Sequence, residues 1–435
     1  MTGIGCDGTR VYIGLSDDGY ERAVKRLHKD VCGNLGLHEK NILNTLNAVN
    51  SKYIVRYWFY DENSDEEFAY LILDLCEETL EQYVASQTLE DLTKDAPGIM
   101  RQILEGLNDL HRKPEPILHR DLKPSNIMRD VHGKWLMADF GLSRTLCDGQ
   151  TTHRSKQRGT TSWRAVESYP TEIDKSGKNT ESNNDSTKSD DQNMTSDNES
   201  TKSGTAKSDN NGKNADLESR YKKQSDIQVA GMVGFYILTK GAHPFGPEAR
   251  RLQNLLDDKP VLASLTDPMA KDLITWMLQH NPEDRPYASE ALKHPFLQSS
   301  DQQFELLERV GNEQEIKKAD SKSDVVNKIN NDDLLPTRDW QSKIHPEVLR
   351  YVSDRRGKCS KRSKISYGNE WSECLRFIRN TSVHWNHNTP PTAVQNVVGK
   401  PQEYFLKVFP TLPVVVHRVI RSQDWKERPE LAKFF

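Results

Sequence analysis

The chain has 435 residues, enough for two or three domains, and its 60 Lys and Arg against 64 Asp and Glu give a net charge of −4. No overall basicity draws it to nucleic acid, so any RNA binding has to come from a local patch. We find no apolar run near the ~18 residues of a membrane span, no signal peptide, and no paired cysteines among the six, so we expect a soluble chain with reduced thiols.

Strand-like runs come first along the chain. Residues 11–15, 21–27, 54–60 and 69–75 are β-branched or aromatic-rich and are bounded by Gly, Asp and Asn. From Leu80 onward the apolar residues take a helical spacing. This order predicts an α+β fold in which a small sheet lobe sits on a larger helical lobe.

Composition divides the rest of the chain. Residues 171–220 are almost entirely polar and contain few apolar side chains, which predicts a disordered surface insertion in a first domain that spans 1–297. Residues 298–335 are again polar and charged, and we interpret them as a connecting segment. The block 336–435 carries four tryptophans and helical stripes, which predicts a compact helical domain.

A glycine-rich motif opens the chain. Gly3, Gly5, Gly8 and Val11 have the spacing G-x-G-x-x-G-x-x-V. Glycines let a backbone pass close over phosphates, where a Cβ would clash. Alone, this motif fits a hairpin turn as well as a phosphate-binding loop.

Further residues suited to phosphate chemistry follow in order. Lys25 lies in a strand-like run, and Glu39 in a helical stretch could orient it by ion pairing. Carboxylate and amide oxygens suit Mg²⁺, a cation that bridges phosphates. The run His-Arg-Asp-Leu-Lys-Pro-Ser-Asn and a later Asp-Phe-Gly supply the remaining candidates: Asp121, Lys123, Asn126 and Asp139.

These motifs in this order resemble the protein kinase fold over residues 3–297. The resemblance implies that the glycine loop covers the phosphates of ATP and that Lys25 contacts them with Glu39 as its partner. It also implies that Asp74 and Cys76 belong to the hinge that holds adenine.

The resemblance assigns the chemistry to four residues. Asp121 would accept the proton of the substrate hydroxyl, and Lys123 would stabilise the transferring phosphoryl group. Asn126 and Asp139 would hold Mg²⁺. The same residues also fit a pseudokinase, which binds nucleotide without transferring phosphate.

Later positions fit the same fold. Glu167 is expected to pair with Arg285, and Asp226 matches a buried aspartate that ties the catalytic loop to the helical core. Two features depart from the pattern. Only two residues precede the glycine loop, so we expect half of the first strand to be missing, and the insertion follows Glu167, where substrate peptides dock in kinases.

An amphipathic helix is predicted at 371–384. One side is apolar, and the other presents Arg379, Asn380 and, if the helix continues, His384. A basic run suited to a phosphate backbone lies just upstream. It consists of Arg355, Arg356, Lys358, Lys361, Arg362 and Lys364. On residue types alone, an ordinary helix with a solvated face would explain the pattern.

In its position after a kinase fold, this block resembles the kinase-extension nuclease domain of the Ire unfolded-protein sensors and RNase L, over residues 300–435. The resemblance implies metal-independent RNA cleavage by attack of a 2′-hydroxyl. His384 would act as general acid, Tyr367 would help to activate the 2′-hydroxyl, and Arg379 and Asn380 would stabilise the charged phosphorane.

The family resemblance also implies partners. ATP or ADP would favour a back-to-back homodimer that assembles the nuclease, and the RNA substrate would be a stem-loop. The location would be cytoplasmic, or the cytosolic face of the endoplasmic reticulum if a sensor and a membrane span precede this chain, which itself would not contact the membrane. Two alternatives stay open, namely a nucleotide-sensing scaffold that controls an RNase and a truncated, non-catalytic interaction module.

Overall fold

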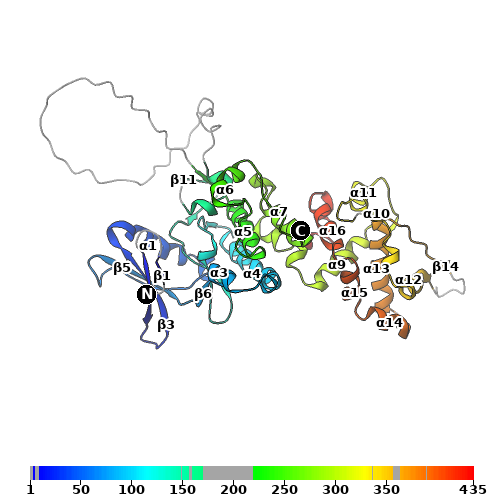
Figure 1. Ribbon diagram of the computed structural model, residues 1–435, viewed down its shortest axis with the longest axis horizontal. Helices are drawn as coiled ribbons and strands as arrows, with labels where there is room; N and C mark the ends of the chain where they lie inside the picture. Colours follow the sequence, from blue (N-terminus) through cyan, green and yellow to red (C-terminus); the bar gives the residue numbers. More distant parts are fainter. Residues whose placement is uncertain are drawn as a thin grey trace, which may run out of the picture.

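The computed structural model describes residues 3–4, 9–147, 149–155, 159–169, 219–335, 337–355, 363–387 and 389–435. Figure 1 shows three parts in a row: a small lobe built on a sheet, a large lobe built on helices, and a C-terminal helical part, called the extension below. The predicted α+β class, with a β-rich beginning followed by helices, is confirmed.

The small lobe contains a five-stranded antiparallel sheet in the order β1-β2-β3-β5-β4. Alternate residues of β5 are buried, namely Ala69, Leu71 and Leu73, because successive side chains of a strand point to opposite faces. Helix α1 (Lys29–Leu43) packs against this sheet. The strands are β1 (Gly3–Ile4), β2 (Arg10–Leu15), β3 (Glu21–His28), β4 (Tyr57–Asp61) and β5 (Phe68–Asp74).

The strand predicted over 54–60 begins three residues later than expected. Ile54 instead makes an isolated parallel bridge to Met137 of β9 (Trp135–Met137), and Val55 donates its backbone N–H to the Met137 carbonyl. Both Ile54 and Val55 are buried. This apolar run therefore joins the two lobes, which local propensity could not reveal.

The large lobe is built around α5, which contains the most apolar run of the sequence. Almost every side chain of α5 is buried, and α4 and α7 pack against it. Among the described residues, no helix has both the length and the apolar character to cross a membrane. The helices of this lobe are α3 (Leu80–Ser86), α4 (Leu89–Leu110), α5 (Lys223–Leu238), α6 (Glu248–Leu256), α7 (Pro268–Met277) and α8 (Ala288–Ala291).

A short antiparallel pair brackets the predicted insertion. Strand β11 (His153–Ser155) pairs with β12 (Ser219–Tyr221), so the chain before the insertion meets the chain after it. Of the insertion expected at 171–220, residues 171–218 lie outside the described residues. Its last two positions belong to β12.

The extension has a hydrophobic core of its own, with buried residues from Phe304 to Phe434. Helix α13 runs through this core and contacts α9 most extensively. The helices are α9 (Ser300–Gly311), α10 (Gln314–Lys317), α11 (Asp324–Asn330), α12 (Pro346–Ser353), α13 (Trp371–His387), α14 (Thr392–Val398), α15 (Pro401–Val408) and α16 (Leu412–Arg421).

The segment expected to be a polar connection, 298–335, differs from that expectation. It holds α9, α10 and α11, whose buried residues, including Leu307, Val310 and Ile329, belong to the core of the extension. The polar residues outnumber the apolar ones because only one stripe of each helix is buried.

Large lobe and extension meet through buried polar contacts. Asp272 of α7 accepts hydrogen bonds from Arg421 of α16 at 2.6 and 3.3 Å, and His294 Nε2 lies 2.9 Å from the same carboxylate. Figure 1 shows the C terminus beside α7, in the middle of the molecule, and Lys293 donates there to the carbonyl of Phe435. The end of the chain thus closes the junction between the two parts.

Candidate functional site

The first cluster lies between the small and large lobes. Strand β3 points Lys25 inward, where its Nζ lies 2.7 Å from Glu39 Oε2 and 2.8 Å from Asp139 Oδ1. Glu39 is only 1% exposed, and its other oxygen accepts the backbone N–H of Phe140. The predicted partner of Lys25 is therefore in contact with it.

The charge of Lys25 and the carboxylate charges around it attract one another. Burial alone would lower the pKa of Lys25, but the carboxylates of Glu39 and Asp139 raise it above its ordinary value. The ammonium of Lys25 in turn lowers the pKa of Asp139. The lysine is thus a fixed cation beside a carboxylate that stays ionised.

Asp121 lies on a buried loop, where both oxygens of its carboxylate accept hydrogen bonds. Its Oδ2 accepts from Lys123 Nζ at 2.8 Å and from Asn126 Nδ2 at 3.0 Å. Its Oδ1 accepts from the backbone N–H and the hydroxyl of Thr160, both at 3.0 Å. Three of the predicted site residues, Asp121, Lys123 and Asn126, thus form one hydrogen-bonded group.

Asp226 holds this loop from below. It accepts backbone N–H groups of His119 at 2.9 Å and Arg120 at 3.0 Å, and its Oδ2 lies 3.0 Å from His111 Nε2. Burial would raise the pKa of Asp226, but these contacts hold it below its ordinary value. Arg120 has a φ of 68°, so the loop turns sharply just before Asp121.

The expected pair of Glu167 and Arg285 is present in the large lobe. Two parallel hydrogen bonds of 2.9 Å join the guanidinium to the carboxylate, and Arg285 is fully buried. Such a bidentate pair fixes orientation as well as charge. It anchors the segment that carries Thr160 to the helical core.

The glycine motif is described only in part. Gly3 pairs with Val11 across β1 and β2, whereas Gly5 and Gly8 lie outside the described residues. Asp74 ends β5 and accepts a hydrogen bond from the indole of Trp58. Cys76 follows in the link to the large lobe, and its burial raises the pKa of its thiol to about 12.

The residues predicted to hold Mg²⁺ fit that ion. Asn126 donates its Nδ2 to Asp121, so its amide oxygen is the atom available to a cation, and Asp139 supplies an ionised carboxylate. Within the described ranges, no three His, Cys, Asp or Glu side chains gather as a metal cage. An amide oxygen and a carboxylate oxygen suit Mg²⁺, which is usually held by one or two protein ligands together with phosphate oxygens and water.

The second cluster lies in the extension, on α13. Asn380 Nδ2 donates to the Tyr367 hydroxyl at 2.8 Å, and Arg379 Nη1 donates to Asn380 Oδ1 at 2.9 Å. Asn380 is only 6% exposed, so the polar side of the helix is covered at this position rather than solvated. Tyr367, which the family resemblance suggested, thus lies in contact with Asn380.

His384 lies one helical turn beyond Asn380, because α13 continues to His387. It is half-buried, and its ring meets Tyr351 of α12 edge-on with the centroids 6.3 Å apart. The four nuclease candidates therefore lie on adjacent turns of one helix and on the loop before it.

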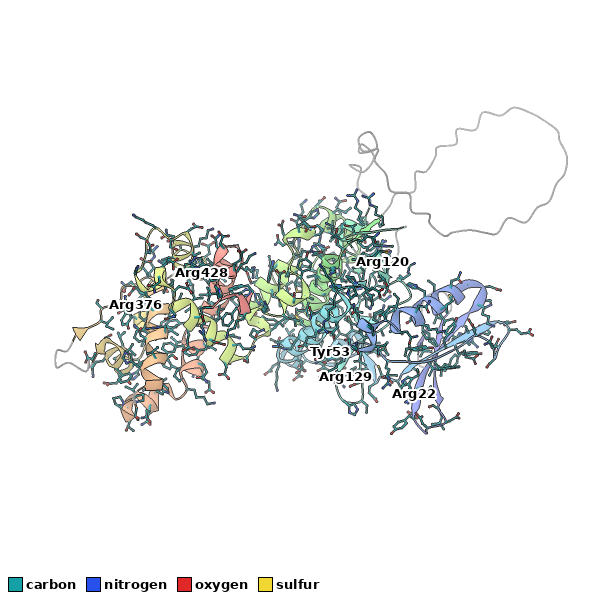
Figure 2. The ribbon with its side chains drawn as sticks, turned by 180° about the vertical axis from the view of Figure 1, so that it is seen from behind. Arg22, Tyr53, Arg120, Arg129, Arg376 and Arg428 are labelled. Carbon is teal, nitrogen blue, oxygen red and sulfur yellow. The ribbon has the colours of Figure 1, made fainter. Side chains whose placement is uncertain are left out.

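Several residues hold Tyr367 in place. Trp340, completely buried, donates its indole N–H to the Gly368 carbonyl, and Gln341 donates to the Tyr367 carbonyl. Arg376, labelled in Figure 2, lies over the Tyr367 ring at 5.3 Å and is held by two hydrogen bonds to Glu373. The buried Trp340 and the ion pair of Arg376 with Glu373 thus frame the phenol.

Sequence reasoning missed two contacts. Nothing in the local sequence around Thr160 indicated that this residue binds Asp121 and Lys123. Asn312 accepts from Arg379 Nε at 3.2 Å across 67 positions. Of the predicted basic run, the part from 356 to 362 lies outside the described residues.

Comparisons with known proteins agree with this division. The family profile described as protein kinase domain matches residues 2–185, and the profile described as ribonuclease 2-5A matches residues 303–435. The chain is therefore a protein kinase domain followed by a ribonuclease 2-5A domain.

Relatives with both parts match almost the whole chain. The serine/threonine-protein kinase/endoribonuclease IRE1 of Hypocrea jecorina is 28% identical over 100% of this chain and 34% of its own length. The sensor for unfolded proteins in the ER of Schizosaccharomyces pombe is 26% identical, over 98% of this chain and 38% of its own. The 2-5A-dependent ribonuclease of Mus musculus is 24% identical, over 85% and 40%.

The chain thus carries both kinds of domain, and its similarity to these kinase–endoribonucleases extends over both of its parts. It spans between about a third and two fifths of the length of the relatives named above.

Proposed function

We propose that this chain is a bifunctional enzyme: a serine/threonine kinase that acts mainly on itself, and a metal-independent endoribonuclease that the kinase domain controls through nucleotide-linked dimerisation. In this proposal the chain serves stress signalling of the unfolded-protein type in the cytoplasm, and it does so at the cytosolic face of the endoplasmic reticulum if it is part of a longer Ire-type protein. The name of the relative from Hypocrea supports the two activities, and the name of the relative from Schizosaccharomyces supports the signalling role.

In the kinase step, Lys25 holds the α- and β-phosphates while Glu39 fixes its position. Asp121 orients the attacking hydroxyl and accepts its proton, and Lys123 neutralises charge on the γ-phosphoryl group as it leaves ADP. Asn126 and Asp139 would hold Mg²⁺, which would neutralise negative charge on the phosphates. The contact of Thr160 with both Asp121 and Lys123 supports a site that is already arranged for hydroxyl substrates.

In the nuclease step, the 2′-oxygen of a ribose bonds to the adjacent phosphorus and the bond to the 5′-oxygen breaks. Tyr367 assists removal of the 2′-proton, and His384 donates a proton to the departing 5′-oxygen. Arg379 and Asn380 stabilise the negative charge that builds on the phosphate oxygens. The products are a 2′,3′-cyclic phosphate and a 5′-hydroxyl.

One observation carries the nuclease proposal: the hydrogen-bonded row of Tyr367, Asn380 and Arg379 on the helix that also bears His384. The test is cleavage of a stem-loop RNA at high protein concentration with ADP and Mg²⁺. We expect cleavage by the unaltered chain, cyclic phosphate ends, and a loss of at least a hundredfold in His384→Ala. Equal rates in the two proteins would refute the assignment.

A second candidate keeps the nuclease but replaces phosphoryl transfer by nucleotide sensing. The contacts of Lys25 with Glu39 and Asp139 support it, because they direct the lysine toward nucleotide phosphates whether or not phosphoryl transfer follows. Labelled ATP separates the two candidates. If the chain is a bifunctional enzyme, the unaltered chain becomes labelled and Asp121→Asn does not. If the chain is only a nucleotide sensor, neither protein becomes labelled and both cleave RNA.

A further inference from the structure

A row of hydrogen bonds leads out of the proposed nuclease site to a residue on another helix. Tyr367, Asn380 and Arg379 form its inner part, as described above. At the outer end, Arg379 Nε donates to Asn312 Oδ1 at 3.2 Å. Asn312 is the residue that ends α9, the first helix after the large lobe.

The approach of α9 to α13 is close at this point because Gly311 has no side chain. A Cβ built on Gly311 would lie 2.5 Å from the Leu375 carbonyl oxygen and 2.9 Å from Arg379 Cβ. Both distances are below any ordinary carbon contact, and the carbonyl belongs to the backbone of α13. The end of α9 is therefore pressed against the turn of α13 that carries Arg379.

Two hydrogen bonds hold the guanidinium of Arg379 on different sides. Nη1 is bound to Asn380 and Nε to Asn312, which leaves further N–H groups of its fork for a phosphate. A long arginine side chain has about 2 kcal/mol of rotamer entropy, so its direction depends on such anchors.

We propose that Asn312 is a positioning residue for RNA cleavage, which sets the plane of the Arg379 guanidinium before the scissile phosphate arrives. This inference rests on the nuclease function proposed above. It gives α9 a part in the site, since the helix that leaves the large lobe ends on the arginine that contacts the phosphate.

The alternative role of Asn312 is that of an ordinary helix end, since its own backbone N–H binds the Arg309 carbonyl. Three variants separate the two roles. Asn312→Ala removes the acceptor, and Asn312→Asp keeps it. The matched control is Asn331→Ala, because Asn331 also ends a helix, α11, and its Oδ1 also accepts from an arginine, Arg338, at 2.6 Å.

The measurement is kcat and KM for cleavage of a stem-loop RNA, together with the melting temperature of each variant. For Asn312→Ala we expect kcat to fall about tenfold with KM within about twofold, because a misdirected arginine weakens the transition state more than substrate binding. We expect Asn312→Asp to stay within about threefold of the unaltered kcat, because a carboxylate also accepts from Nε–H. Asn331→Ala should match the unaltered chain in kcat.

The kcat values with Asn312 and with Asn312→Ala are then also compared in chains that carry Arg379→Lys. If Asn312 acts through the guanidinium, Asn312→Ala adds almost no further loss there, because the two effects are not additive. An unchanged kcat in Asn312→Ala, or a full tenfold loss on top of Arg379→Lys, would overturn the inference while the nuclease function stands. An unaltered chain that leaves the RNA whole would overturn the proposed function and this inference with it.

Discussion

Thr160 illustrates how a single hydroxyl can organise a reaction centre. It donates to Asp121 Oδ1 through both its backbone and its side chain, and its hydroxyl accepts from Lys123 at 2.8 Å. The proposed base and the proposed phosphate-binding lysine are thus held at a fixed separation. The bidentate pair of Glu167 and Arg285 holds the segment that carries Thr160.

Replacing Thr160 by Ala should slow self-phosphorylation without unfolding the chain. Loss of a hydrogen bond to a charged group costs about 1.5–3 kcal/mol, which corresponds to a loss of roughly 10- to 100-fold in rate. The measurement is the initial rate of label transfer from ATP, with Thr161→Ala as the neighbouring control. Equal rates in the two variants would show that the Thr160 contacts do not matter for transfer.

His243 gives the large lobe an acid-sensitive contact. Its Nε2 lies 2.9 Å from the Ser162 carbonyl, and its Nδ1 accepts the Phe245 N–H, so the ring is bound in its neutral form. Burial, together with Arg251, lowers the pKa of His243 to about 3. The unfolded chain takes up this proton near pH 6.5, whereas the folded chain does so only near pH 3.

Because the unfolded state binds the proton first, the free energy of unfolding is highest above about pH 6.5 and falls as the pH is lowered toward 3. In His243→Asn the slope between pH 6 and 4 should be shallower by about 1.4 kcal/mol per pH unit. Urea denaturation at several pH values measures this, with exposed His132→Asn as control. Parallel curves for the unaltered chain and His243→Asn would contradict the assignment.

At the residue level, the sequence predicted contacts between residues of the family motifs, but not contacts that involve residues outside those motifs. The order of motifs was enough to expect Lys25 beside Glu39 and Asp226 beneath the catalytic loop, because a known fold fixes those distances. Asn312 and Arg379 meet only because α9 and α13 cross at Gly311. No local pattern encodes that crossing.

Glycines set the spacing between the helices of the large lobe. A Cβ on Gly231 of α5 would lie 2.9 Å from Met277 Cβ, an atom fixed to the backbone of α7. Gly98 of α4 is also helical, but a Cβ there would meet nothing within 4 Å. The same residue type thus has opposite consequences at two positions.

Gly231→Ala should lower the free energy of unfolding by about 1–3 kcal/mol, because overpacking forces α5 and α7 apart. Gly98→Ala should raise it by about 0.5–1 kcal/mol, because alanine favours the helical state and clashes with nothing. Denaturant melts of both variants test the pair. Two changes of the same sign would contradict this account of the packing.

Element prediction succeeded where periodicity was local and failed where the partner was remote. The helix over 371–384 extends as α13 to His387, as its stripe of apolar residues indicated. The helical structure of the polar segment 298–335 was not predicted, because its few apolar residues become buried only against α13 and α16. Likewise, the strand predicted over 54–60 lacks its first residues, because Ile54 pairs with Met137 of the other lobe.

The junction between the large lobe and the extension depends on Asp272. This nearly buried carboxylate binds Arg421, lies beside His294, and is 3.9 Å from Arg418. Burial would raise the pKa of Asp272, but these neighbours hold it below its ordinary value. Arg421 also lies over the Trp276 ring at 4.2 Å, so both parts contribute to one polar and aromatic cluster.

Arg421→Met should weaken this junction, because it leaves the Asp272 charge buried without its strongest partner. Breaking a buried pair in this way costs about 3–5 kcal/mol. Calorimetry should show a lower melting temperature, whereas Arg350→Met, which breaks an exposed pair with Glu347, should change it little. Similar thermograms for the two variants would show that Asp272 does not hold the parts together.

In the function proposed above, the nucleotide site and the nuclease site belong to one enzyme that is active as a pair of chains. The most direct test is the rate of stem-loop cleavage per chain, measured over a range of protein concentrations with and without ADP and Mg²⁺. We predict that the rate per chain rises with concentration, that ADP shifts this rise to lower concentration, and that Lys25→Met abolishes the shift. A rate per chain that is independent of both concentration and nucleotide would contradict the account.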